Sequence, residues 1–456
     1  MTKDDNIDLF NLKASDFGKD FIWGVASSSY QIEGAHDEDG KGASIWDVFV
    51  HKNRFLIPTV MTREVGDVAC DFYHRYESDI AMIADLGFKA NRFSVSWPRI
   101  LPTGTGKVNQ KGLDFYSRVV DSNLANNLEP WITLYHWDLP QALQEKGGWQ
   151  DRQIVEYFAE FTDVVTKKLG DRVKNWMIFN EPLSFCAGGY LLGAMAPGII
   201  NPSGFMASVH HVNLCQARGA SVIRENVKKA NVGTTHVIAP VHAMGTKSFQ
   251  IKAQESVNAL MHRIYLDPNL GLGYPFGLSP LVDLVKRHIK DDDEKDIRVD
   301  FDFIGAQYYS TIKAIPVPFL KGIPAKPKPK TGQDADMLKS PVNPKGLYES
   351  LEFLNSYGRF KNIIVTENGF STRDVVENNR VYDLRRVDYI RQHIPWVLKA
   401  VQDDIPVTGY MYWSFMDNFE WALGFRPRFG LIYVDFENLD RTVKDSGLWF
   451  RKFLAK

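Results

Sequence analysis

The chain has 456 residues, of which 44% are hydrophobic and 24% charged, and its formal net charge is -1. This composition is ordinary for a globular protein, and the balanced charge excludes the strongly basic surface on which binding to nucleic acid or to an anionic membrane depends. No stretch approaches the roughly 20 consecutive apolar residues of a membrane-spanning helix.

Eight short apolar runs alternate along the chain with longer segments in which apolar residues recur at helical spacing. The predicted strands are, in chain order, residues 21–26, 90–97, 130–136, 175–180, 232–239, 301–308, 362–366 and 409–415. The clearest intervening helices are predicted at residues 73–86, 154–169 and 384–401. Strands that alternate with helices pair in parallel. Eight such units favour a closed barrel. An open dinucleotide-binding sheet would show GxGxxG after an early strand, and the sequence has no such motif there. We therefore expect an α/β fold, a single (β/α)8 TIM barrel with elaborated βα loops over residues 1–456.

One segment does not fit the alternation. Residues 316–345 are rich in proline and lysine, which alternate almost without interruption between residues 324 and 330. This composition is typical of a solvated, partly extended surface loop. Because the segment follows the sixth predicted strand, it would lie on the carboxyl-terminal face of a barrel, where enzymes of this fold have their sites. The sequence thus predicts either a surface loop or a lid that forms the outer wall of a substrate site.

Polar and aromatic side chains gather where the predicted strands end. They are Arg92 in the second strand, His136 in the third, Asn180 and Glu181 at the fourth, Tyr309 after the sixth, Glu367 after the seventh, and Trp413, Glu420 and Trp421 in or after the eighth. Singly, each has an ordinary explanation: Glu181 precedes a proline in a loop, and Glu367 begins a turn signal. His136 and the two tryptophans suit a core or pocket wall. The predicted site rests on their coincidence at one end of different strands.

The fourth and seventh strands lie three apart around an eight-stranded ring, so Glu181 and Glu367 face each other across the pocket. Most glycoside hydrolases need two carboxyl groups that flank one bond, and a separation of about 5–5.5 Å gives retention through a covalent intermediate. One carboxyl must be protonated and the other ionised. Arg92 and the Tyr309 hydroxyl would favour the charged form of Glu367, whereas Glu181 has no local cation and faces a negative neighbour. We therefore expect Glu181 to be the acid/base and Glu367 the nucleophile.

Four segments resemble signatures of glycoside hydrolase family 1, the β-glucosidases and β-galactosidases. They are residues 21–35, Asn180-Glu181-Pro182, Thr366-Glu367-Asn368-Gly369, and the run from Trp413 to Trp421. The resemblance extends over nearly the whole chain. It implies a retaining exo-β-glycosidase that hydrolyses terminal non-reducing β-D-glucosyl residues, with galactosyl and fucosyl residues as close alternatives. The implied substrate is a small-molecule β-glycoside or oligosaccharide, and no cofactor or metal is implied.

The resemblance also implies a role for each matching residue. Glu181 corresponds to the acid/base, Glu367 to the nucleophile, and Arg92 and Tyr309 to the residues that position it. The implied substrate contacts are Asn180 with the sugar 2-hydroxyl, Trp413 as a stacking floor, and Gln31, His136, Glu420 and Trp421 with the remaining hydroxyls. An aromatic floor rimmed by polar groups suits a sugar, whose ring has apolar C–H faces.

Three features bear on specificity. Family members that act on 6-phosphorylated sugars lack the equivalent of Glu420, so we expect a neutral monosaccharide in the innermost subsite. Gln307 stands where the family usually has asparagine, which lengthens the arm of the amide two residues before Tyr309. No tryptophan occurs between Trp176 and Trp396, although the family often places one after the sixth strand to contact the leaving group. We therefore expect an unusual leaving-group preference.

Two other functions are open on the same fold. A transglycosylase passes the covalent intermediate to a sugar or alcohol instead of water, and a non-catalytic carbohydrate-binding relative lacks one carboxylate. The presence of both Glu181 and Glu367 argues against the second. The polar, acidic first residues are unlike a secretory signal, and the three cysteines include no CxxC pair. A cytoplasmic protein is therefore expected, with no nucleic-acid or membrane partner and with its oligomeric state open.

Overall fold

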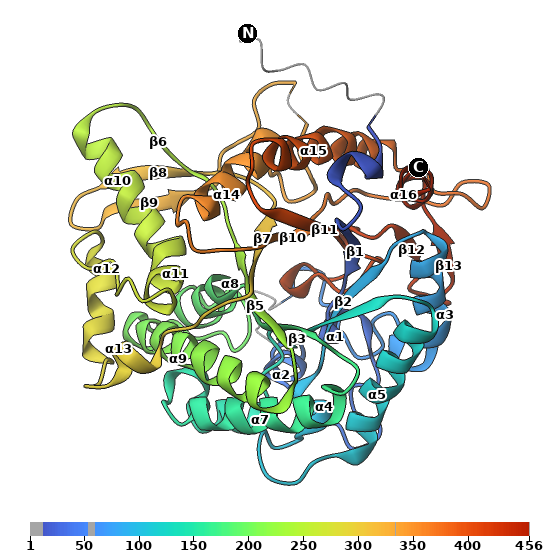
Figure 1. The fold of residues 1–456 in the computed structure, drawn as a ribbon, viewed down its shortest axis with the longest axis horizontal. Helices are drawn as coiled ribbons and strands as arrows, with labels where there is room; N and C mark the ends of the chain where they lie inside the picture. Colours follow the sequence, from blue (N-terminus) through green and yellow to red (C-terminus); the bar gives the residue numbers. More distant parts are fainter. Residues whose placement is uncertain (1–11, 53–59, 333, 456) are drawn as a thin grey trace.

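Eight parallel strands form a closed barrel in the computed structural model, which describes residues 12–52, 60–332 and 334–455. Around the barrel the order is β1-β11-β10-β7-β5-β4-β3-β2, and Figure 1 shows these strands at the centre of a ring of helices. The strands are β1 (Ile22–Ala26), β2 (Ala90–Ser94), β3 (Glu129–Tyr135), β4 (Asn175–Asn180), β5 (Asn231–Val237), β7 (Phe303–Tyr308), β10 (Ile363–Asn368) and β11 (Val407–Trp413). The predicted TIM barrel is confirmed, and each predicted strand is present with ends that differ by a few residues.

Helices surround the barrel (Figure 1). The longer ones are α3 (Phe72–Asp85), α5 (Gln110–Ala125), α7 (Ile154–Leu169), α9 (Pro202–Asn226), α10 (Ser248–Asn258), α14 (Lys345–Asn355), α15 (Leu384–Gln402) and α16 (Asp445–Leu454). Shorter helices are α1 (Ser29–Ile32), α2 (Ile45–His51), α4 (Trp97–Ile100), α6 (Gln141–Gln144), α8 (Pro182–Cys186), α11 (Ile264–Asn269), α12 (Pro280–Asp283) and α13 (Asp293–Asp296). In α7, Phe158, Val165 and Leu169 are buried at the spacing of one helix face. The three predicted helices are confirmed.

A layer of apolar side chains fills the barrel below the strand ends. It consists of Ala90, Trp131, Met177, Phe303, Ile364 and Met411, all buried, with Ile22 packed against them. These residues come from seven of the eight strands, so this end of the barrel is a packed core. Any pocket must therefore lie beyond this layer, toward the carboxyl ends of the strands.

Strand alternation explains which later residues point into the barrel. Arg92, Gln307 and Trp413 follow inward-facing residues of their own strands by an even number of positions, so they also face inward. Asn180 and Glu367 follow Met177 and Ile364 by three positions, and simple alternation would turn them outward. The pairing register shifts between Met177 and Asn180 and between Val365 and Glu367. Such irregularities re-aim side chains, and here they bring both residues to the interior.

The expectation of a loop over residues 316–345 is wrong for its first part. Strand β8 (Ile312–Val317) pairs with β9 (Lys321–Ala325) and with β6 (Val241–Ala243) in a three-stranded sheet. Ala253 and Val257 of α10 cover one face of this sheet, because they pack against Val241 and Ala314. Figure 1 shows the sheet and α10 at one side of the molecule. The remainder of the segment, apart from residue 333, which lies outside the described residues, runs to the start of α14. A small antiparallel pair, β12 (Ile432–Val434) with β13 (Arg441–Val443), precedes α16.

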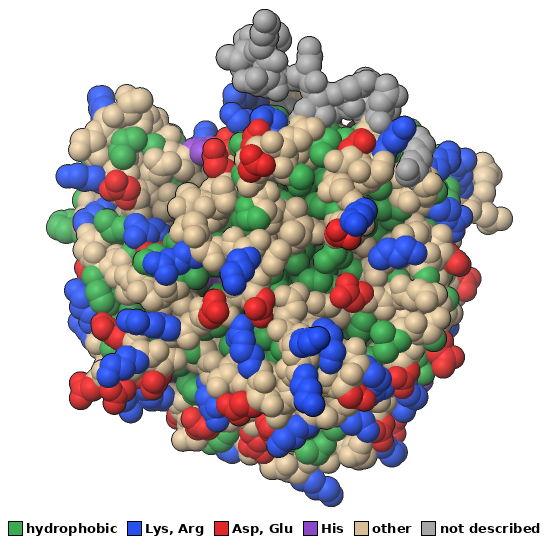
Figure 2. Space-filling view, in the orientation of Figure 1, with side chains coloured by type: hydrophobic (Ala, Val, Ile, Leu, Met, Phe, Trp, Pro, Cys, Tyr) green, Lys and Arg blue, Asp and Glu red, His purple; other side chains and the backbone are tan. Residues whose placement is uncertain are grey.

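The surface carries no single dominant charge on the face that Figure 2 shows, where acidic and basic side chains are interspersed. This agrees with the net charge of -1. Among the described residues, no helix combines the length and apolarity needed to cross a bilayer.

Candidate active site

The two predicted catalytic carboxyl groups are buried at the carboxyl ends of β4 and β10. Only 7% of Glu181 and 4% of Glu367 is exposed. Glu181 has a left-handed backbone, with φ of 46°, directly before α8. A non-glycine residue in this region is unfavourable and persists only where the surrounding structure enforces it. The register shift in β4 and this turn together direct successive side chains, Asn180 and Glu181, toward the pocket.

Three donors surround the Glu367 carboxylate. Arg92 Nη1 donates to Oε1 at 2.6 Å, Gln307 Nε2 donates to the same oxygen at 2.7 Å, and the Tyr309 hydroxyl donates to Oε2 at 2.7 Å. Burial raises the pKa of Glu367, whereas the charge of Arg92 and the hydrogen bonds from Tyr309 and Arg92 oppose that rise. These contacts stabilise the ionised form. The predicted neighbours Arg92 and Tyr309 are thus in place, and Gln307 is an addition.

Glu181 has a poorer set of donors. The Ser184 hydroxyl donates to its Oε2 at 2.6 Å. Burial and then the negative charge of Glu367 raise the pKa of Glu181 to about 8, while the Ser184 hydrogen bond and Arg92 act in the opposite direction. Of the two carboxyls, Glu181 is therefore the one whose surroundings favour a bound proton near neutral pH, which is the environment that the predicted acid/base role needs.

Ser184 provides a direct test of how the pKa of Glu181 is set. The Ser184→Ala variant loses a hydrogen bond to the charged form of Glu181, so we expect the pKa of that carboxyl to rise further. The basic limb of the kcat/KM profile, where activity falls as Glu181 loses its proton, should then move to higher pH. Ser221→Ala is the matched control, because that serine lies on the exposed side of α9 and donates to Glu225. A basic limb that moves to lower pH or stays in place in Ser184→Ala would contradict this account.

Asn180 has a fixed amide orientation. Its Oδ1 accepts hydrogen bonds from Arg92, from Gln307 at 2.7 Å and from Thr235 at 3.3 Å, so its Nδ2 faces His136 Nε2, at 2.9 Å. His136 Nε2 must then be an acceptor, and its proton resides on Nδ1. Burial and the charge of Arg92 lower the pKa of His136, which keeps the ring neutral.

Among the residues of this site, three buried polar atoms have no hydrogen-bond partner in the described part of the protein. They are His136 Nδ1, a donor, and the oxygens Glu420 Oε1 and Gln307 Oε1. Burial raises the pKa of Glu420 to about 8, although hydrogen bonds from Trp413 and Asn418 oppose the shift. Near neutral pH the carboxyl is therefore largely protonated and can both donate to and accept from a hydroxyl group. Buried polar groups are nearly always satisfied, so the pocket is suited to a ligand with several hydroxyls.

The aromatic residues predicted for substrate binding converge on His136. The ring of His136 stacks on those of Trp413 and Trp421, with both centroid distances 5.8 Å. Trp421 also stacks on Tyr30 at 5.8 Å. Gln31 lies nearby, but its Nε2 donates to Asn418 Oδ1 at 2.8 Å and to the Phe419 carbonyl at 3.0 Å. The Gln31 amide thus holds the β11 loop. Its Oε1 accepts from the Ser28 hydroxyl at 2.6 Å and retains one further acceptor site.

Sequence reasoning missed the buried ion pairs beneath the β11 loop. Lys444 is fully buried and its Nζ contacts Asp417 Oδ1 at 2.6 Å and also Asp374. Arg428 Nη1 contacts the other oxygen of Asp417 at 2.6 Å. Asp417 directly precedes Asn418, the partner of Gln31, so these pairs anchor the segment that carries Glu420 and Trp421. No spacing rule connects Lys444 to partners so distant in the chain.

The Lys444→Met variant should be strongly destabilised. Removing the ammonium leaves the buried carboxylates of Asp417 and Asp374 without one of their cations, and breaking a buried pair costs about 3–5 kcal/mol. Urea unfolding should show a lower midpoint with an unchanged slope. Lys295→Met is the control, because that lysine is 82% exposed in its weak contact with Asp292. Equal midpoints for the two variants would show that the buried pairs do not hold this part of the fold.

The later part of the proline- and lysine-rich segment reaches the same face of the barrel. Met337 N donates to the Ser371 carbonyl at 3.2 Å, in the loop after β10. The next residue, Leu338, packs against a cluster formed by Ala26, Trp413 and Phe429. Residues near 338 therefore lie beside the predicted sugar floor. Lys326, directly after β9, donates to the Leu338 carbonyl at 2.5 Å.

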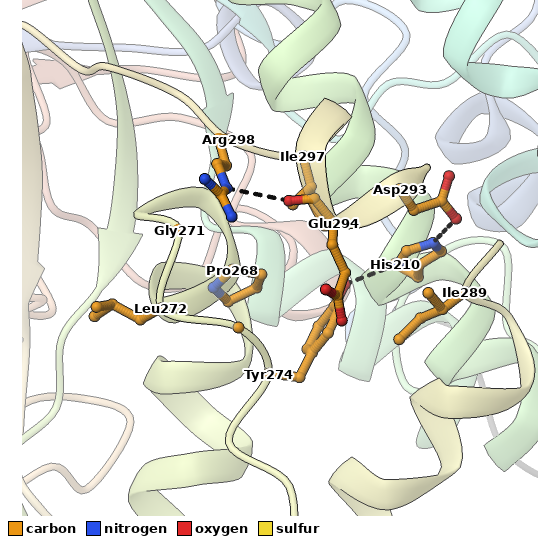
Figure 3. Close-up of a pocket in the computed structure, with 11 residues that line it drawn as sticks. His210, Pro268, Gly271, Leu272, Tyr274, Ile289, Asp293, Glu294, Ile297 and Arg298 are labelled. Carbon is orange, nitrogen blue, oxygen red and sulfur yellow. Dashed lines mark hydrogen bonds and ion pairs between the residues drawn. The ribbon is translucent and has the colours of Figure 1, made fainter. Parts of the chain in front are cut away.

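A hollow of about 240 Å³ lies outside the barrel between α9, α11 and α13 (Figure 3). Its buried His210 contacts the Tyr274 hydroxyl and Asp293 Oδ2, both at 2.8 Å. Arg152 also pairs with Asp293. Both ring nitrogens of His210 are therefore satisfied within the protein, unlike those of His136. None of the residues predicted for catalysis or sugar binding lines this hollow.

Comparison with known proteins identifies the family. Residues 13–456 match the model of glycosyl hydrolase family 1. Beta-glucosidase A of Thermotoga maritima is 40% identical over 442 residues, which cover 95% of this chain and 96% of that protein. A bifunctional beta-D-glucosidase/beta-D-fucosidase of Bifidobacterium breve is 38% identical and covers 96% of this chain and 98% of its own. The structure of a family 1 β-glucosidase from Thermotoga maritima in complex with isofagomine lactam superposes with a TM-score of 0.90 at 39% identity, over 96% of this chain and 98% of the other. The chain belongs to glycosyl hydrolase family 1.

Proposed function

We propose that this protein is an exo-acting β-glycosidase that hydrolyses terminal non-reducing β-D-glucosyl residues with retention of configuration. The observation that carries the proposal is the pair of buried carboxyls, Glu181 and Glu367, in opposed environments at the ends of β4 and β10. Arg92 and the Tyr309 hydroxyl stabilise the anionic form of Glu367, whereas the surroundings of Glu181 favour its protonated form. This division of roles is what a double displacement needs.

In the first step, the Glu367 carboxylate attacks the anomeric carbon as the bond to the leaving oxygen breaks. The leaving oxygen takes the electron pair of that bond and the proton of Glu181. In the second step, ionised Glu181 removes a proton from water, which attacks the anomeric carbon and releases Glu367. Asn180, fixed by Arg92 and Gln307, donates its remaining Nδ2 hydrogen to the sugar 2-hydroxyl.

The polar and aromatic groups of the pocket support a neutral monosaccharide in the innermost subsite. His136 Nδ1 and Glu420 Oε1 are without a partner among the described residues, and the His136 ring stacks on that of Trp413, which is suited to the apolar face of a sugar. A phosphate group would carry negative charge into a buried region where Glu420 offers no cation to pair with it, which is costly. Glucose is the proposed sugar, and a fucoside is a second substrate in view of the bifunctional relative.

We place the protein in the cytoplasm, where its three buried, unpaired cysteines would remain reduced.

Hydrolysis of p-nitrophenyl glycosides tests this proposal. The β-glucoside, β-fucoside and β-galactoside should be cleaved, the β-glucoside or β-fucoside with the highest kcat/KM, and the α-glucoside should be inert. The Glu367→Gln variant, assayed at the same concentration, controls for a contaminating enzyme. Turnover of the 6-phospho-β-glucoside without turnover of the β-glucoside would overturn the substrate assignment.

A further inference from the structure

Gln307 occupies a central position among the catalytic groups. It is fully buried near the end of β7, on the inward face of the strand. The two hydrogens of its Nε2 go to two different site residues: Asn180 Oδ1 at 2.7 Å and Glu367 Oε1 at 2.7 Å. One amide thus connects the nucleophile to the residue that faces the sugar 2-hydroxyl.

The donors on Glu367 are distributed unequally between its two oxygens. A carboxylate oxygen has two acceptor sites. Both sites of Oε1 are occupied, one by Arg92 at 2.6 Å and the other by Gln307. Among the described residues, Oε2 accepts only from Tyr309, at 2.7 Å. Oε2 therefore keeps a lone pair for the substrate, and Oε1 does not.

We propose that Gln307 is a positioning residue that fills the second acceptor site of Glu367 Oε1, makes Oε2 the attacking atom, and holds Asn180 in register with it. This inference rests on the proposed function. Glutamine has a longer side chain than the asparagine usual at this position, and its amide donates to Asn180 and Glu367 at the same time.

The donors on the two oxygens of Glu367 also match the movement of charge during the reaction. The bond from Oε2 to the anomeric carbon forms as the bond to the leaving oxygen breaks, and the leaving oxygen receives its electron pair and the Glu181 proton. Oε1 becomes the carbonyl oxygen of the ester and still accepts from Arg92 and Gln307. Oε2 becomes the ester oxygen, a weaker acceptor, so the Tyr309 hydrogen bond weakens. The two-donor contact on Oε1 is thus kept throughout, and it holds the carboxylate plane in one orientation.

Two observable properties should depend on Gln307. The first is the acid limb of the kcat/KM profile, which reports the ionisation of Glu367. The titratable or charged groups around Glu367 are Arg92, Glu181, Tyr309 and Glu420. Substitution of Gln307 replaces none of these groups. The second property is the contribution of the sugar 2-hydroxyl, because Gln307 fixes the amide of Asn180.

The test compares Gln307→Met, which has nearly the same length but no donor, with Gln307→Asn and with Thr235→Val. Thr235 donates to Asn180 Oδ1 at 3.3 Å, and no contact of it with Glu367 is present among the described residues. Thr235→Val is therefore a matched control that perturbs Asn180 alone. Each protein is assayed over pH with p-nitrophenyl β-D-glucopyranoside and its 2-deoxy analogue, and circular dichroism checks folding.

We expect Gln307→Met to lower kcat/KM by roughly 10- to 150-fold, the range for a lost hydrogen bond to a charged group. Its acid limb should move to higher pH, because the lost donor stabilised the carboxylate, and Gln307→Asn should restore part of both properties. Removal of the sugar 2-hydroxyl should lower kcat/KM less in Gln307→Met than in the wild type. Thr235→Val should weaken the 2-hydroxyl effect without moving the acid limb. If Gln307→Met does not fold, Gln307→Glu should show a larger shift of the acid limb, because it places a second carboxyl beside Glu367.

A Gln307→Met enzyme with the wild-type acid limb and the full 2-hydroxyl effect would overturn the inference. A wild-type protein that does not cleave the β-glucoside, or that releases α-glucose first, would instead overturn the proposed function. The two failures are therefore distinguishable, because the first is seen only in the variant and the second already in the wild type.

Discussion

The Glu367→Ala variant should hydrolyse p-nitrophenyl β-D-glucopyranoside about 10⁴- to 10⁶-fold more slowly than the wild type, the range for loss of a covalent nucleophile. Without the carboxylate no ester with the anomeric carbon can form, and water has no base on that side of the sugar. The loss should appear in kcat, measured from initial rates of nitrophenolate release. Because alanine would also leave the buried donors of Arg92 and Tyr309 without an acceptor, Glu367→Gln, which keeps an acceptor oxygen, should be measured as well.

Added azide should restore turnover of Glu367→Ala, because the small anion can occupy the space of the lost side chain. It would attack from the side of the nucleophile and give α-glucosyl azide. Glu352→Ala on the exposed face of α14 should retain wild-type activity and controls for unspecific effects. Activity of Glu367→Ala within about tenfold of the wild type would contradict the assignment of the nucleophile.

The Glu181→Ala variant should show a loss that depends on the leaving group. General acid catalysis contributes about 10²- to 10⁴-fold, and only a leaving oxygen of high basicity needs the full contribution. We expect kcat/KM for cellobiose to fall by about three powers of ten and that for 2,4-dinitrophenyl β-D-glucopyranoside to fall far less. Steady-state kinetics with the two substrates gives the comparison, and equal losses would contradict the role of Glu181 as the proton donor.

The pH dependence follows from the pKa of about 8 for Glu181. The first step needs the protonated form, so kcat/KM should fall as the pH rises through about 8 in the wild type. This basic limb should be absent in Glu181→Ala, which has no proton to lose at that position. A basic limb of unchanged position in the variant would mean that another group titrates there.

Much of this architecture is predictable from the sequence because its periodicities are local. Apolar spacing predicts the eight barrel strands and α7, and the inward direction of Arg92 follows from alternation within β2. The inward direction of Asn180 and Glu367 does not follow from alternation, since register shifts in β4 and β10 produce it. Only the coincidence of polar residues at the strand ends indicates that they share a pocket.

Other features depend on contacts between distant parts of the chain. The β8–β9 hairpin contains Pro316 and Pro324, residues disfavoured in strands, and its support from α10 is invisible in the local sequence. The pairing of Lys444 with Asp374 and Asp417 likewise carries no spacing signal. Ser184 is different: it lies three residues after Glu181, at the start of a helix, where a hydroxyl can reach back to the preceding carboxyl. Helical spacing after the acid/base motif could have identified it.

The most direct test of the central claim is proton NMR of the anomeric signals during hydrolysis of p-nitrophenyl β-D-glucopyranoside, recorded from the earliest times. Two displacements at one carbon, by Glu367 and then by water, predict that β-glucose appears first and α-glucose later by mutarotation. If α-glucose appears first, a single displacement has occurred, and Glu367 is not a covalent nucleophile.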